Sequence, residues 1–143
     1  MAHEMKTPVG SGAEYGPSYG TPDAGSGWMT FAAAMFIASG LGNALWGIAA
    51  LVNDDYFAAD ELLFGDLSMW GVFYLLLAAV QFVTAWLIFR RSAVGTILGI
   101  SLALLHLLVA LMSIAAYPLW TVILLTIDGL IIYGLTAYGF EEA

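Results

Sequence analysis

Four long apolar stretches run through the chain between positions 28 and 140. A helix rises about 1.5 Å per residue, so about 20 apolar residues are enough to cross the hydrocarbon core of a bilayer. All four stretches reach that length. They are continuously apolar, which favours helices over the short alternating strands of a membrane barrel. The sequence therefore predicts an all-α protein with four transmembrane helices, over residues 28–52, 67–89, 93–116 and 118–140.

The connections between the spans predict how the helices are arranged. Residues 53–66 form a polar loop, and Arg90 and Arg91 form a tight turn. Tyr117-Pro118 marks an abrupt reversal, with proline at a helix start, where a missing N–H has no intrahelical partner to lose. Short connections make successive helices antiparallel neighbours. We therefore expect residues 28–140 to form an antiparallel four-helix bundle.

Positive charges predict the orientation of this bundle. Arg90 and Arg91 lie in the short loop between the second and third spans, and short loops that carry Lys or Arg stay in the cytoplasm. Lys6, in the N-terminal segment, points to the same side. The sequence thus predicts a multi-pass protein of the plasma membrane with both termini in the cytoplasm and the acidic loop 53–66 outside.

The two ends of the chain differ from the membrane domain. Residues 1–27 are rich in Gly, Pro and Tyr and have no apolar periodicity, which is typical of a disordered tail. Residues 141–143 form a short C-terminus beyond the last span. Both segments are expected in the cytoplasm.

The amino-acid composition of the chain limits the kinds of molecule that it is expected to bind. Hydrophobic residues make up 62% of the chain and charged residues 10%, a balance far from that of soluble domains, so the lipid bilayer is the expected partner. The net charge of -8 with only three Lys and Arg argues against nucleic acid, which requires clustered basic side chains. Zero cysteines exclude disulfides, iron–sulfur clusters, thiolate zinc sites and a cysteine nucleophile.

Each span contains one conspicuous polar side chain, and the four lie at a similar depth. Asn43, Gln81, His106 and Asp128 are ten or eleven residues from the end of their spans that faces outward in the predicted topology. That count corresponds to about 15 Å, which is close to the middle of the bilayer. The sequence therefore predicts a polar layer at mid-membrane depth.

Asp128 is the only Asp, Glu, Lys or Arg inside the four spans. A charge at mid-bilayer costs roughly 2.5 to 3.5 kcal/mol on insertion scales, so Asp128 is expected to face the bundle interior and to find a partner. His106, on the adjacent antiparallel span, is the natural one. The pair can share a proton or form an ion pair. The alternative is that the polar layer consists of interhelical hydrogen bonds that only hold the helices in register.

Small residues mark the predicted packing face of the third span. Gly95, Gly99 and Ala103 recur at intervals of four, and His106 continues the same face. Small residues in this spacing allow helix backbones to approach closely. The predicted inward faces of the first two spans are Ser39, Asn43, Trp46 and Ala50, and Gly71, Tyr74, Ala78, Gln81 and Thr84.

Several motifs resemble those of a known family. They are GWMTFA at the start of the first span, the cluster of Gly40, Asn43 and Gly47, DLSMWG at the second span, and YPLWTVILLTIDGLIIYGLTAYG at the end. Through these motifs the chain resembles a family of small four-helix membrane proteins common in actinobacteria and known only as a domain of unknown function. The resemblance covers residues 28 to about 139. It implies a multi-pass membrane protein and implies no chemistry.

Two classes of function stay open. The first is a non-enzymatic structural or accessory membrane component, as a homo-oligomer or with another membrane protein. The second is a small proton-linked transporter or sensor that uses Asp128 and His106. No nucleophile, metal set or cofactor motif is present, so neither catalysis nor a cofactor is expected. A single His in the spans is no metal site unless an oligomer brings two together, and the acidic loop lacks the DDxxD spacing, since position 58 is Ala58.

Overall fold

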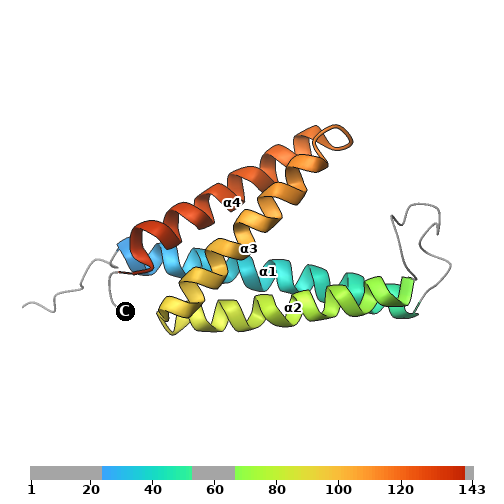
Figure 1. The fold of residues 1–143 in the computed structure, drawn as a ribbon. Helices are drawn as coiled ribbons and strands as arrows, with labels where there is room; N and C mark the ends of the chain where they lie inside the picture. Colours follow the sequence, from blue (N-terminus) through green and yellow to red (C-terminus); the bar gives the residue numbers. More distant parts are fainter. Residues whose placement is uncertain (1–23, 53–66, 141–143) are drawn as a thin grey trace, which may run out of the picture.

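The computed structural model describes residues 24–52 and 67–140, which form four α-helices (Figure 1). Each helix is long and apolar enough to cross a membrane, and these residues contain no strand. The predicted all-α architecture is confirmed, and the four helices indicate a multi-pass membrane protein. Their bounds are α1 Ala24–Val52, α2 Leu67–Phe89, α3 Ala93–Met112 and α4 Pro118–Tyr138. The predicted tail up to residue 23, the loop 53–66 and the C-terminus 141–143 lie outside the described residues.

Three helix ends differ from the predicted bounds. Helix α1 begins at Ala24 instead of position 28, because its first turn packs on α4: a Cβ added to Gly25 would lie 3.4 Å from Cδ1 of Tyr138. Residues 24–27, assigned to the tail by composition, are therefore helical. Helix α3 ends at Met112, and residues 113–116 form a turn. Helix α4 ends at Tyr138, where the backbone N–H of Gly139 caps it by donating to the carbonyl of Leu135.

The turn between α2 and α3 is short and tightly hydrogen-bonded. Arg91 has a φ of 51°, in the left-handed region. Its N–H donates to the carbonyl of Ile88 at 2.9 Å, and that of Ser92 donates to the carbonyl of Leu87 at 3.0 Å. The Arg90 guanidinium carbon lies 5.1 Å from the centre of the Trp86 ring. This turn marks one end of the bundle, which we call the Arg90 end.

The hydrophobic core lies towards the Arg90 end, and all four helices contribute to it. Each of α1, α2 and α3 contributes at least one alanine to it, which allows the helices to approach closely. Its members are Met29, Ala32, Ala33 and Phe36 of α1, Ala85 and Ile88 of α2, Ala103 of α3, and Ile131 and Leu135 of α4.

Two glycines of α3 permit this close approach. A Cβ added to Gly95 would lie 2.6 Å from the backbone carbonyl carbon of Leu87 on α2. A Cβ added to Gly99 would lie 2.7 Å from Cδ1 of Leu135 on α4 and 3.1 Å from Cδ1 of Ile88 on α2. Real Cβ atoms do not fit at such distances. At Gly95 the close atoms belong to the α2 backbone, so this position requires glycine, whereas a side chain at Gly99 would force Leu135 and Ile88 to move.

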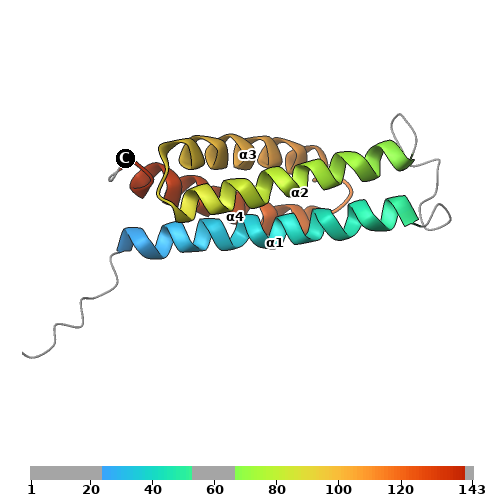
Figure 2. The same ribbon diagram turned by 90° about the horizontal axis from the view of Figure 1, so that it is seen from below.

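The opposite end of the bundle, which we call the Tyr117 end, is open. Helices α1 and α2 stay side by side along their whole length (Figures 1 and 2), and near the Tyr117 end a Cβ added to Gly47 would lie 2.9 Å from the carbonyl oxygen of Gly71. The α3–α4 hairpin diverges from them towards its turn (Figure 1). Residues 111–120 are all exposed. The two hairpins therefore join at the Arg90 end and separate towards the Tyr117 end.

Candidate functional site

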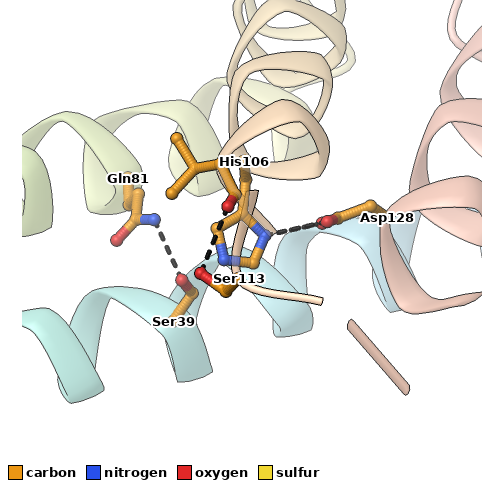
Figure 3. Close-up of polar contacts among 6 residues, drawn as sticks. Ser39, Gln81, His106, Ser113 and Asp128 are labelled. Atoms are coloured by element: carbon orange, nitrogen blue, oxygen red, sulfur yellow. Dashed lines mark hydrogen bonds and ion pairs between the residues drawn. The ribbon is translucent and has the colours of Figure 1, made fainter. Parts of the chain in front are cut away.

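Three polar side chains hold α1 and α2 together near their middle. The Asn43 amide donates to Oε1 of Gln81 at 2.7 Å, and the Gln81 amide donates to Oγ of Ser39 at 2.9 Å. Gln81 is buried and thus uses both ends of its amide group. Figure 3 shows it pointing towards Ser39 across the two helices. We call Ser39, Asn43 and Gln81 the amide cluster.

A second polar contact joins α3 and α4. Nδ1 of His106 lies 2.8 Å from Oδ2 and 3.1 Å from Oδ1 of Asp128 (Figure 3). The Asp128 side chain is only 6% exposed, whereas that of His106 is 46% exposed. The carboxyl group therefore lies inside the bundle, and the imidazole is the part of the pair that is exposed at the surface.

The position of His106 on α3 contrasts with its exposure. Gly95, Gly99, Ala103 and Ala110 are all buried, and His106 continues their stripe at intervals of three and four residues. The ring therefore lies on the face of α3 that points towards the other helices. The side chain is nevertheless 46% exposed, although the alanines on either side of it along the stripe are buried.

The four predicted polar residues fall into two bonded groups. The amide cluster includes Asn43 and Gln81, and the other group is the pair of His106 and Asp128. Within the part of the chain that the structure describes, no hydrogen bond connects the two groups. Each group thus joins the helices of one hairpin, and neither ties the hairpins to each other.

Chemically, the pair offers one carboxyl and one imidazole. Together they can hold or pass a proton, because each can be donor or acceptor. Among residues 24–52 and 67–140, no group of three or more His, Cys, Asp or Glu side chains could hold a metal ion. The arrangement is suited to binding or proton exchange at a single ring nitrogen.

The structure also places the other residues singled out by sequence. Gly95, Gly99 and Ala103 are buried, and Arg90 and Arg91 form the turn between α2 and α3. Trp46, expected on the inward face of α1, has 56% of its surface exposed. Its ring is too large for a face where Gly47 and Ala50 make the close contacts.

One contact between helix ends was not predicted. Oγ1 of Thr96 donates to the carbonyl oxygen of Gly139 at 3.0 Å, and the Thr96 side chain is fully buried. The bond ties the start of α3 to the end of α4 at the Arg90 end. Thr96 directly follows Gly95 on the packing face, which is the sequence signal that could have identified it.

Comparisons with known proteins identify the family. Searches of the curated proteins and of the solved structures each give no match. The family model described as Domain of unknown function (DUF7144) matches residues 28–140. This match covers the four helices apart from the first turn of α1, and the chain therefore belongs to this family of unknown function.

Proposed function

We propose that this protein is a non-enzymatic accessory component of the plasma membrane that works by binding another membrane protein through the α3–α4 hairpin. One observation supports the proposal: near the Tyr117 end, α3 and α4 diverge from α1 and α2 (Figure 1), and their apolar side chains are exposed. Met112 is 87% exposed, Leu119 77% and Trp120 61%. Exposed Trp and Met side chains are enriched at protein contact surfaces.

The chemistry of the site supports a binding role over catalysis. His106 and Asp128 form an acid–base pair, but a nucleophile has to lie within hydrogen-bonding distance of its base. In the described residues the only side-chain bonds of His106 are those to Asp128. An accessory role requires a stable surface that another protein can bind, and it does not require a nucleophile.

Site-specific photocrosslinking in native membranes tests the proposal. A photoreactive amino acid at Met112 should crosslink to a protein, either a second copy or another membrane protein. The same amino acid at Ile97, which is 56% exposed but lies near the Arg90 end, is the matched control and should give lipid adducts only. Lipid adducts alone at both positions would contradict a partner at the hairpin.

A second candidate function is a proton-linked sensor or small transporter. The half-exposed ring of His106, bonded to the buried carboxyl of Asp128, favours it because one face of the pair can exchange protons with the surroundings. The four helices are continuous over their bounds, without the broken helices typical of transporters, so sensing suits the fold better than transport. NMR titration of the ring in nanodiscs decides this point. A ring that never titrates between about pH 5 and 8 would leave only a structural role.

A further inference from the structure

The net charge of the His106–Asp128 pair determines which of its atoms carry a hydrogen. Two arrangements carry no net charge and satisfy both groups: an imidazolium facing a carboxylate, and a neutral imidazole whose Nδ1 accepts a hydrogen bond from a protonated carboxyl. A neutral imidazole that donates from Nδ1 to a protonated carboxyl also has no net charge, but it leaves the buried carboxyl O–H without an acceptor. At mid-bilayer depth a net charge is costly, so the pair is held in one of the first two forms. Nδ1 is the nitrogen that faces Asp128. In both forms the other nitrogen, Nε2, therefore carries a hydrogen.

This Nε2–H group is a donor that the chain itself does not satisfy. All side-chain hydrogen bonds of His106 within the described residues use Nδ1, and the side chain is 46% exposed. A donor without an acceptor in hydrocarbon is unfavourable. The exposed part of the ring thus presents a hydrogen-bond donor to its surroundings.

Depth restricts what that acceptor can be. Asp128, which His106 contacts, lies ten residues after Pro118, the first residue of α4. The ring is therefore about 15 Å along the bundle from the start of that helix. The ester carbonyls of phospholipids lie at the edge of the hydrocarbon core, which is about 30 Å thick, and so remain about 15 Å from the ring. A molecule that is itself lipid-soluble can carry an acceptor to this depth.

We propose that His106 binds the carbonyl oxygen of a lipid-soluble quinone, with Nε2–H as the donor and Asp128 as the residue that positions the ring. A quinone combines a planar ring, two carbonyl acceptors and an apolar tail, and it partitions into the hydrocarbon core. Ala103 and Ala110, on either side of His106 along the stripe, are buried, whereas the His106 side chain itself is 46% exposed and so accessible to a ligand. The step is binding alone, with no electron transfer, and it does not depend on the accessory role proposed above.

The test uses the full-length protein in phosphatidylglycerol nanodiscs with decylubiquinone as the probe. Binding should lower the carbonyl stretching frequency of the quinone and shift the ¹⁵Nε2 resonance of His106. Decylbenzene, which has the tail and a ring but no carbonyl, should do neither. Dioleoylglycerol tests whether ester carbonyls can replace the quinone and should not shift the resonance.

Three variants complete the experiment. His106→Phe combined with Asp128→Leu removes donor and carboxyl together and should weaken binding about tenfold or more, the loss expected for one hydrogen bond. His106→Gln retains an N–H donor and should retain part of the affinity. Leu105→Ala, at a neighbouring position with 56% exposure, is the matched control and should bind normally.

The following results would overturn the proposal. One is equal quinone affinity in the parent, the double variant and His106→Gln, and another is an unshifted carbonyl band on binding to the parent. A ¹⁵Nε2 shift that follows protein concentration without quinone would assign the donor to a second copy of the chain. A shift with dioleoylglycerol equal to that with the quinone would assign it to a lipid ester.

Discussion

The Arg90 end and the Tyr117 end of the bundle have similar apolar composition but opposite packing. At the Arg90 end, α3 meets its neighbours through Gly95 and Gly99, and all four helices share one core. At the Tyr117 end, α1 and α2 still meet through Gly47 and Gly71, whereas α3 and α4 diverge from them. In lipid, apolar surface alone does not drive helices together. The size of the side chains on the facing stripes therefore determines where two helices can approach closely. His106 is the first large side chain on the α3 stripe after Gly95, Gly99 and Ala103, and it is half exposed.

Cysteine labelling tests which end of the bundle faces the cytoplasm. This is the largest expected effect, because each introduced cysteine should either react with the reagent or not react at all. Because the chain contains no cysteine, single-cysteine variants can be read directly. In intact cells, Asp60→Cys in the loop 53–66 should react with an impermeant thiol reagent, and Ser92→Cys at the Arg90 end should not. The reverse pattern would invert the topology. Labelling of both from outside would rule out the four-span arrangement.

A glycine-to-leucine comparison tests the closed core. In Gly99→Leu the new side chain would collide with Leu135 and Ile88, since even a Cβ lies 2.7 Å and 3.1 Å from their Cδ1 atoms. We expect a loss of about 3 kcal/mol or more in unfolding free energy, because overpacking a tight core forces backbones apart. Gly129→Leu is the matched control, since a Cβ there has nothing within 4 Å. Melting in detergent measures both.

Leu98→Ala, on a different face of α3, should cost less than Gly99→Leu because the parent side chain is already 36% exposed. If Gly99→Leu melts at or above the parent temperature, or if Gly129→Leu loses as much, close packing at the Arg90 end is not what holds the hairpins together.

A double-mutant cycle tests the pair of His106 and Asp128. Asp128→Asn and His106→Gln should each destabilise the protein by about 1 to 3 kcal/mol, because each leaves a polar partner without its bond. The double variant should lose less than the sum of the two, since the removed groups contact one another at 2.8 Å. Denaturation in mixed micelles gives the three values. Additive losses would show that the contact carries no coupling energy.

The four helices and the contact between His106 and Asp128 could be predicted from the sequence because both follow from counting. Apolar length locates the four spans, and the bounds of α2 are those predicted, 67–89. Equal depth and antiparallel neighbours lead to the contact between His106 and Asp128. Both inferences need only the helical rise and the thickness of the bilayer.

The separation of the hairpins could not be predicted, because it depends on how side chains of four helices fit at once. The periodicity of α3 places His106 on the inward stripe, but whether the ring is covered depends on the distance to α1 and α2. For the same reason the sequence treats Asn43, Gln81, His106 and Asp128 as one layer, and the structure divides them into two groups. The early start of α1 likewise depends on Tyr138, more than 100 positions along the chain.

The smallest effect is expected from the hydrogen bond that closes the Arg90 end. Thr96→Val keeps the shape of the side chain and removes its donor to the Gly139 carbonyl, so the unfolding free energy should fall by about 1 kcal/mol. Thr126→Val is the matched control: that exposed hydroxyl donates within its own helix, to the Val122 carbonyl, and its loss should leave stability unchanged. Thermal unfolding in nanodiscs compares the two. Equal melting temperatures would mean that the ends of α3 and α4 are held by glycine packing alone, and the closed end would then owe its stability to side-chain size and not to hydrogen bonding.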